Sequence, residues 1–486
     1  MDLFLVFAVV FIALVFSYTN GFHDTANAIA TVVGTKVLTP RQAIMLAAVT
    51  NLFGSFFGLA VAKTISSGLV EGAFVTQEVL ICSLVAAIFW NLLTWWYGLP
   101  SSSTHALVGS LIGAALGFAV CMNSAKPLVR ADLKLPAAPT TGLSAEAIQQ
   151  LQDKQKEPIS VWTAVKFVEV KDKKVKTLVA PSPEAVAALG NSIKTNGTHN
   201  IKVGANATQL VVFSGRVMAV TTETKKAGDK SGVLHKVVIP MVSSPLIGFA
   251  AGMTVMGLLY VVLRNWRPVT VNRVFGKLQL ASSAYMGFSH GMNDATKCMG
   301  IITLALVAAT KSGVFANVPG WANWLVTPEG SNPFSLSLGD RMMSILPNFL
   351  QFGYMPAPVD VKSQGVADWV VIICALTMAM GTAAGGWRII KTLGHKMVKL
   401  QPVHGFAAET TAATVLAVTA AYGMPVSTTH AITTSIMGVG CAKRFSALKL
   451  KVIERILWAW IMTIPATAGV AFGLVWLSSK VGWIKF

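Results

Sequence analysis

Long apolar segments dominate this sequence and limit what the chain can fold into. They lie at about 3–18, 42–62, 79–97, 106–120, 240–263, 278–309, 368–387, 403–422 and 456–478. Many approach or exceed the roughly 20 residues that a helix needs to cross the hydrocarbon of a bilayer. Only 12% of the residues are charged, whereas soluble proteins carry about a quarter. Because backbone groups in lipid must be satisfied internally, and barrel strands are far shorter, we expect an all-α integral, multi-pass membrane protein.

The charged residues and the cysteines agree with this class. The net charge of +19 comes from basic residues in separate loops, which argues against nucleic-acid binding. The five cysteines lie in or at the ends of apolar runs, which favours free structural thiols over disulfides or metal ligands. The N-terminus lacks a basic leader and a cleavage site, so we expect a first span there and not a removed signal peptide.

A polar cluster at residues 20–28 interrupts the first apolar segment. The cluster recurs at residues 291–297, where Asp294 matches Asp24 after 270 residues (294 − 24). A carboxylate in lipid is costly and usually has a function, with a cation, a proton or a lysine as its partner. We therefore expect a paired ion site, in which the first helix is interrupted and resumes at 29–33. If each aspartate only caps a broken helix, transport is still compatible with the pattern.

A second motif also occurs twice, at residues 98–105 and 423–430. Each copy reads Gly-x-Pro followed by hydroxyl residues and histidine, which predicts a helix break and then a helix start. The free N–H groups and the positive dipole end of such a start bind oxyanions such as phosphate or sulfate. The alternative is a kinked helix whose hydroxyls only satisfy the backbone, but duplication favours anion binding. The anion-binding residues are predicted to be Ser101, Ser102, Ser103, Thr104, Ser427, Thr428 and Thr429.

The two motifs recur in the same order, which predicts an internal duplication. The short basic loops 264–277, 388–399 and 443–455 belong in the cytoplasm, whereas the corresponding parts of the first half should face outward. The halves are then inverted, as in many secondary transporters with re-entrant or broken helices. We predict a first membrane repeat at 1–122, an extracytoplasmic insert at 123–239, and an additional span with the second repeat at 240–486. Both termini are expected outside.

The predicted insert is polar and holds no span. Alternating residues at 159–179 and 201–220 predict strands, and short helices are expected at 144–155 and near 182. We expect a small soluble α+β domain without a readable function. Residues 311–366 are expected to form an amphipathic connection.

Single residues in the motifs suggest how an ion could be coupled. Asn27 and Asn293 supply carbonyl oxygens that suit hard cations such as sodium. Lys297 stands where the first half has Asn27 and could replace a cation, contact the anion or form a plain ion pair. His23 belongs to the residue type that titrates near neutral pH. The predicted coupling residues are His23, Asp24, Asn27, Asn293, Asp294, Lys297 and the intramembrane Glu409, while His105 and His430 are expected to be neutral groups that hydrogen-bond near Ser or Thr.

The two copies of the polar cluster and the two copies of the Gly-x-Pro motif resemble the inorganic phosphate transporter (PiT) family. The resemblance covers both membrane halves but not the insert. The resemblance implies phosphate between two re-entrant hairpins, cations near the paired aspartates, and neither enzyme activity nor a cofactor. Sodium-coupled members are similar but carry asparagine at the positions of His23 and Lys297, and glutamate at that of Asn51. The chain therefore looks more like the bacterial low-affinity, proton-coupled branch, which is thought to carry phosphate partly as a neutral metal–phosphate complex.

The resulting prediction is a secondary transporter that imports inorganic phosphate with protons across the bacterial inner membrane. A sulfate or other oxyanion permease and a sodium-coupled phosphate symporter stay open, and so does an anion channel as a different class. A membrane phosphatase matches poorly, because serine and histidine near the half-helices are a weak nucleophile–base pair. No resident metal site is predicted. The expected partners are phosphate, protons, divalent metal–phosphate and lipid, and the oligomeric state, a homodimer included, stays open.

Overall fold

The computed structural model describes residues 2–68, 75–125, 239–311, 314–315, 325, 366–398, 400–443 and 448–484, and seven strands between residues 130 and 224. The chain divides into two compact units, Met1–Cys121 with Ser231–Phe486 and Met122–Lys230. The short helices expected at 144–155 and near 182, and most of the connection 311–366, lie outside the described residues.

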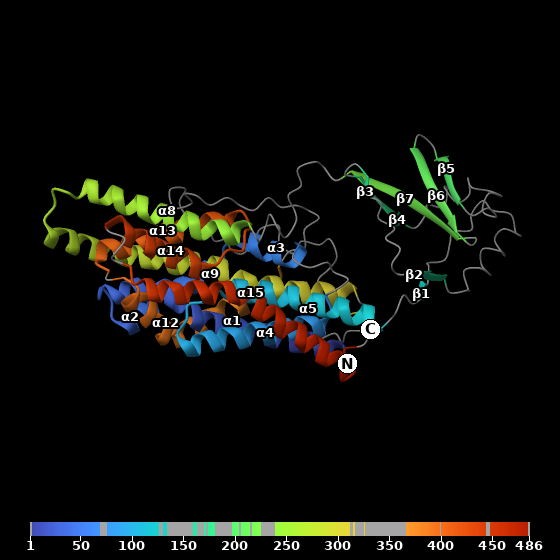
Figure 1. Cartoon of the computed structure of the whole chain (residues 1–486), viewed down its shortest axis with the longest axis horizontal. Helices are drawn as coiled ribbons and strands as arrows, with labels where there is room; N and C mark the ends of the chain where they lie inside the picture. Colours follow the sequence, from blue (N-terminus) through green and yellow to red (C-terminus); the bar gives the residue numbers. More distant parts are fainter. Residues whose placement is uncertain are drawn as a thin grey trace, which may run out of the picture. The chain divides into compact units, whose positions relative to one another are not determined.

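The first unit consists of helices (Figure 1). Six described helices are long and apolar enough to cross a membrane, or up to eight if each of two bent pairs is one span, so the chain is a multi-pass membrane protein. The helices are α1 (Asp2–Gly34), α2 (Pro40–Gly54), α3 (Leu59–Gly68), α4 (Gln77–Tyr97), α5 (Ser103–Ala125), α8 (Ile239–Val262), α9 (Pro268–Lys311), α11 (Asp368–Ala384), α12 (Trp387–Lys391), α13 (Pro402–Ala421), α14 (Thr428–Lys443) and α15 (Leu450–Lys480), with a π-helical segment at Thr392–Lys396.

Helix α1 runs through the polar cluster without the predicted interruption. The cluster contains no proline, and Thr25 donates from Oγ1 to the Gly21 carbonyl oxygen at 2.7 Å, within the same helix. The polar side chains find partners on other helices, so the backbone ladder need not open. The bends occur elsewhere. Helices α2 and α3 form an angle of 67° inside the segment 42–62, where one span was predicted. Helix α11 and the following segment form an angle of 58° near the predicted end of the segment 368–387.

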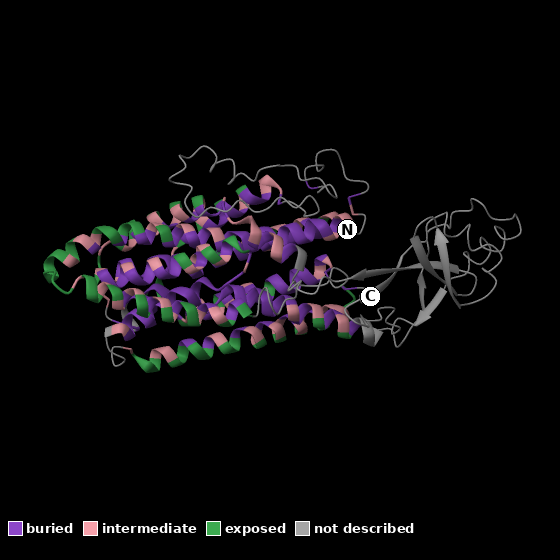
Figure 2. Cartoon of the chain, turned by 90° about the horizontal axis from the view of Figure 1, so that it is seen from above, coloured by how far each residue is buried: buried purple, intermediate pink, exposed green. Residues whose placement is uncertain are grey.

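The basic segments are more helical than predicted. Helix α9 already begins at Pro268, and α15 begins at Leu450 inside the segment 443–455. The segment 388–399 is largely helical as well. Figure 2 shows exposed residues gathered around the turn between α8 and α9, where Arg264 and Arg267 are exposed, while buried residues follow the inner faces of the helices.

Close contacts link the two parts of the helical unit. Helix α1 packs against α11, and α9 packs against α2. At the α2–α9 crossing, Gly54 lies against the backbone of Phe288. At the α1–α11 crossing, Gly381 lies against the backbone of Tyr18. A side chain at either glycine would overlap the facing carbonyl group, so small residues set these helix distances. The two crossings correspond, because Tyr18 and Phe288 are also 270 positions apart (288 − 18).

The second unit contains the strands that the alternating pattern predicts. A five-stranded antiparallel sheet has the order β3-β4-β7-β6-β5, and β1 and β2 form a separate antiparallel pair. The strands are β1 (Arg130–Leu133), β2 (Ile159–Trp162), β3 (Val170–Lys171), β4 (Lys174–Val179), β5 (Gly197–Val203), β6 (Asn206–Phe213) and β7 (Arg216–Thr224).

Candidate anion and ion site

The two Gly-x-Pro motifs each separate one helix from the next, as predicted. Gly98 ends α4 with φ +65°, and Gly423 follows α13 with φ +66°, a backbone region that favours glycine. Helices α5 and α14 begin a few residues later. We call these two helices the half-helices.

One serine caps each half-helix. The Oγ of Ser102 accepts a hydrogen bond from the His105 backbone N–H at 3.1 Å, and the Oγ of Ser427 accepts one from the His430 backbone N–H at 3.2 Å. This is the usual role of serine at a helix N-cap. Both serines therefore hold the helix starts in place. Ser101 donates its hydroxyl to Thr94 Oγ1 at 2.8 Å.

The next hydroxyl of each half-helix bonds the aspartate of the repeated cluster. Ser103 donates from Oγ to Asp24 Oδ2 at 2.8 Å, and Thr428 donates from Oγ1 to Asp294 Oδ2 at 3.3 Å. The four side chains are almost fully buried. In the structure, a hydrogen bond thus links each Gly-x-Pro motif to one copy of the polar cluster. The sequence alone did not indicate this pairing.

The third hydroxyl of each half-helix bonds a side chain from the other half of the chain. Asn27 donates from Nδ2 to Thr429 Oγ1 at 3.0 Å. At the matching place Lys297 donates from Nζ to Thr104 Oγ1 at 2.5 Å, and also to Asp294 Oδ1 at 2.5 Å. Helices α1 and α9 therefore each contact a half-helix from the opposite part of the sequence.

Two buried histidines lie against the two aspartates. His23 Nδ1 is 2.7 Å from Asp24 Oδ1, and its Nε2 is 3.1 Å from Thr94 Oγ1. The sequence analysis missed His290, whose Nε2 lies 3.3 Å from Asp294 Oδ2. Its place one helical turn before Asp294 was the available signal.

The side chains around the aspartates could hold a small cation. Ligand atoms of Asp24, His290 and Asp294 all lie within 4.8 Å of one another. The carboxamide oxygens of Asn27 and Asn293 are buried and have no hydrogen-bond partner among the described residues. Buried polar atoms of this kind are rare unless water or an ion satisfies them.

Glu409 lies in a separate polar cluster on α13. Its carboxylate is fully buried and accepts hydrogen bonds from Thr31, Ser282 and, at 3.4 Å, from Gln279 Nε2. No salt bridge to Glu409 occurs in the described part of the chain. Helices α1 and α9 supply the partners.

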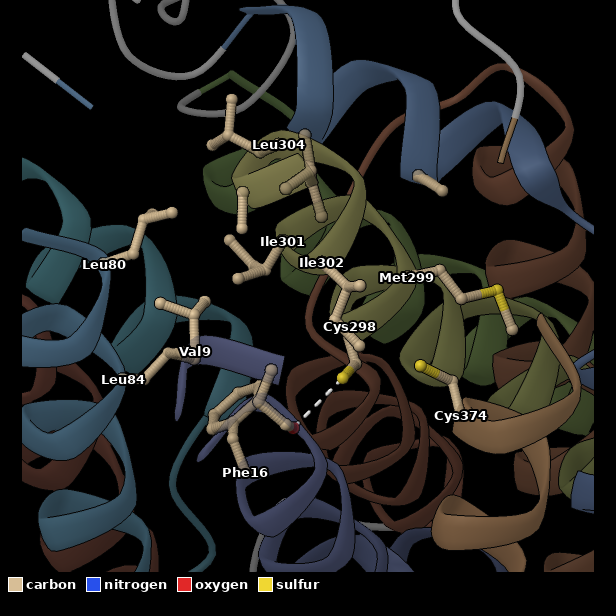
Figure 3. Packing of buried hydrophobic residues seen from close by; sticks show 14 of the residues in the cluster. Val9, Phe16, Leu80, Leu84, Cys298, Met299, Ile301, Ile302, Leu304 and Cys374 are labelled. Atoms are coloured by element: carbon tan, nitrogen blue, oxygen red, sulfur yellow. Dashed lines mark hydrogen bonds between the residues drawn. The ribbon is translucent and has the colours of Figure 1, made fainter. Parts of the chain in front are cut away.

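The corresponding place in the first half of the chain is apolar. The motif spacing matches Glu409 to Leu84 (both 14 residues before the glycine), Thr31 to Ile301 and Gln279 to Val9. All three apolar residues belong to one buried cluster, shown in Figure 3. At these matched positions the first half of the chain has neither a carboxylate nor polar neighbours for one.

The backbone N–H groups of His105 and His430 bond serine side chains, but among the described residues their imidazole rings show no hydrogen bond to serine or threonine. Their rings stack at a centroid distance of 4.4 Å, and His430 also stacks on Trp460 at 3.8 Å. Trp460 in turn donates from Nε1 to the Pro100 carbonyl oxygen at 3.0 Å. The stack therefore joins the starts of both half-helices.

Comparison with known proteins shows which family has a similar sequence and fold. Residues 20–171 and 186–471 match the phosphate transporter family. A protein of Rhizobium meliloti named "Probable low-affinity inorganic phosphate transporter" is 30% identical over 94% of this chain and 91% of its own length, and a Bacillus subtilis protein of the same name is 28% identical over 96% of both. A solved structure titled "The sodium-dependent phosphate transporter" has a TM-score of 0.54 at 17% identity and covers 98% of this chain and 99% of its own, which supports the fold.

The matched ranges include both copies of the polar cluster and both half-helix starts. They confirm the resemblance that the motifs indicated, and phosphate is the substrate of the family. The family and the similar proteins are transporters and not enzymes, as expected. This chain therefore belongs to the phosphate transporter family.

Proposed function

We propose that this protein imports inorganic phosphate by proton symport across the bacterial inner membrane. One observation carries the proposal. Each half-helix start, which can bind an oxyanion through its N–H groups, donates a hydroxyl to a buried aspartate, through Ser103 and Thr428. Anion binding and a change in charge at the aspartates can then influence each other. The proteins of similar sequence from Bacillus subtilis and Rhizobium meliloti carry names of phosphate transporters, which supports the substrate.

Protons are the proposed coupling ion because histidine and carboxylate groups lie in direct contact. The pairs His23–Asp24 and His290–Asp294 can each hold or release a proton without a cage of oxygen ligands. Glu409 is a further proposed proton carrier, since its buried carboxyl group has only neutral partners. Phosphate itself keeps a proton near neutral pH, whereas sulfate does not.

Sodium coupling is the second candidate, and a specific observation favours it. The carboxamide oxygens of Asn20, Asn27 and Asn293 are buried without partners among the described residues, and such oxygens are sodium ligands. A third form of the substrate is a neutral complex of phosphate with a divalent metal. The cluster of Asp24, His290 and Asp294 could accept the metal of that complex.

Uptake into proteoliposomes separates these possibilities. We expect a pH gradient alone to drive accumulation of radiolabelled phosphate, and labelled sulfate to stay outside. Accumulation driven only by a sodium gradient would show that sodium, and not the proton, is the coupling ion. Preference for sulfate would overturn the substrate, and entry that follows the anion gradient without accumulation would identify a channel. Removal of divalent metals with a chelator tests the metal–phosphate form.

We also propose an inverted-repeat architecture. Corresponding contacts in the two parts support a duplication, such as Gly54 with Phe288 and Gly381 with Tyr18. The exposed Arg264 and Arg267 fit a cytoplasmic turn between α8 and α9. Both termini and the insert 123–239 are then extracytoplasmic. A membrane-impermeant thiol reagent should label a cysteine introduced at Lys202 in intact cells and should not label one at Arg267. The reverse labelling pattern would show that the protein has the opposite orientation in the membrane.

A further inference from the structure

The two aspartate sites share a hydrogen-bonding plan in which one of four matched positions differs in chemistry. Their histidines differ as well, since His23 matches Asn293 and His290 matches Asn20. In both sites, a hydroxyl at the start of a half-helix bonds the aspartate, and the side chain three residues after the aspartate bonds the other half-helix. The matching pairs are Asp24 with Asp294, Ser103 with Thr428, Thr429 with Thr104, and Asn27 with Lys297. Three pairs keep the same chemistry. The fourth exchanges a neutral carboxamide for an ammonium group.

Lys297 lies where a cation bound to Asp294 would lie. Its Nζ is 2.5 Å from both Asp294 Oδ1 and Thr104 Oγ1, and the side chain is fully buried. These two contacts come from different parts of the sequence, a carboxylate of α9 and a hydroxyl of α5. Carboxylate and hydroxyl oxygens are also the ligands that a hard cation prefers.

The Asp24 site contains no such fixed charge. Asp24 accepts hydrogen bonds from Ser103 and Thr429 and contacts His23, which is charged only when protonated. Asn27 leaves its Oδ1 without a partner among the described residues. Within the described part of the chain, the Asp24 site therefore has a carboxylate without a fixed positive partner and a carboxamide oxygen without a hydrogen-bond partner. These groups can take up one further proton or cation. His290 and Asp24 are the other titratable groups near Asp294, because ligand atoms of these three residues lie within 4.8 Å of one another.

We propose that Lys297 is a tethered cation that permanently fills one of two matching sites. The Asp24 site alone then takes up and releases a proton or cation with each phosphate. This inference rests on the proposed function but not on whether the ion is a proton or sodium. It assigns Lys297 a role in setting how many ions move: one per phosphate, where two open sites would move two.

The test restores the second site. Lys297→Asn gives the Asp294 site the same side chain as the Asp24 site, and Lys297→Arg keeps the positive charge. The melting temperature of each purified full-length protein is measured in sodium chloride and in choline chloride at about 0.1 M. We expect sodium to raise the melting temperature of Lys297→Asn by about 2 °C more than that of the wild type, because a new ligand site stabilises the folded state. Lys297→Arg should respond like the wild type.

An equal sodium response of Lys297→Asn and wild type would overturn the inference, and so would an increased response of Lys297→Arg. If Lys297→Asn does not melt cooperatively, Lys297→Gln repeats the comparison with a longer carboxamide. The comparison needs no transport. It therefore still decides the role of Lys297 if phosphate uptake proves not to be proton-driven, and a wild type that accumulates phosphate under a pH gradient confirms the proposed function separately.

Discussion

Ser103 donates a hydrogen bond from Oγ to Oδ2 of Asp24 at 2.8 Å, although the two residues are 79 positions apart. Ser103 is the first residue of the half-helix α5, and Asp24 lies in the middle of α1. The bond connects the proposed anion site to the proposed ion site without an intermediate residue. Protonation of Asp24 or binding of a cation to it therefore changes the charge that this hydroxyl faces.

Replacing Ser103 by alanine should weaken phosphate binding. The change removes one predicted hydroxyl donor to the anion. Because a hydrogen bond to a charged group is worth about 1.5–3 kcal/mol, we expect the phosphate Kd to rise by about tenfold or more. Isothermal titration of the purified protein measures the Kd. Ser110→Ala is the matched control, because Ser110 lies on the same helix but its hydroxyl is 3.0 Å from that of Ser83. An equal effect of both changes would assign Ser103 a structural role only.

Replacing Asp24 by asparagine should separate exchange from accumulation. The variant keeps the shape of the side chain but cannot take up a proton. We expect phosphate accumulation under a pH gradient to fall to background, while exchange of labelled for unlabelled phosphate across the liposome membrane continues. Intact accumulation in Asp24→Asn would remove Asp24 from the coupling mechanism.

Replacing Glu409 by glutamine should also reduce proton-driven uptake. Glutamine has nearly the same volume, but its amide hydrogens face the hydroxyl groups of Thr31 and Ser282, which now donate to the carboxylate. We expect initial uptake to fall by about tenfold, because ionisable groups within a membrane often belong to proton pathways. Thr414→Ala is the control, since Thr414 is exposed on the same helix. Wild-type uptake with Glu409→Gln would show that this carboxyl group carries no proton.

Replacing Gly54 or Gly381 by valine should destabilise the fold. Each new side chain would overlap the backbone of the facing helix, at Phe288 and Tyr18 respectively. Overpacking of this kind costs about 1–3 kcal/mol. A fluorescence-monitored thermal melt should show a lower melting temperature for both variants. Gly473→Ala provides the comparison, because a Cβ there meets nothing within 4 Å, and its melting temperature should stay unchanged.

Much of the helical plan was predictable from the sequence. Apolar runs give the span-length helices, and the Gly-x-Pro motifs give the helix starts at Ser103 and Thr428, because glycine and proline act locally. Most strands of the second unit lie in the alternating segments 159–179 and 201–220, but β1 and the beginning of β5 were not predicted. The continuous path of α1 was not predictable in this way, since the partners of its polar residues come from distant helices. The bends after α2 and α11 also depend on how these helices pack.

The composition of the site was predictable, but its pairing was not. The repeated motifs named Asp24, Asp294 and the hydroxyl residues, because duplication makes such positions visible. The pairing of Asn27 with Thr429 and of Lys297 with Thr104 could not be predicted. It depends on how helices from the two halves of the chain pack against one another. His290 carries no repeated counterpart, since the first cluster has Asn20 in its place. The stacking of His105 on His430 likewise arises only when both half-helices meet.

The packing of α1 against α11 has a consequence for biosynthesis. Gly21 faces the backbone of Gly381, which the ribosome adds 360 residues later (381 − 21). At roughly 5–20 residues per second, α1 waits about 20–70 s for this partner. The partners of His23 and Asp24 are made early in that interval, since Thr94 and Ser103 follow 71 and 79 residues later, whereas Asn20 reaches its partner Asp294 only after 274 residues. The face of α1 that packs against α11 must therefore lie against lipid, water or the translocation machinery until α11 has been made.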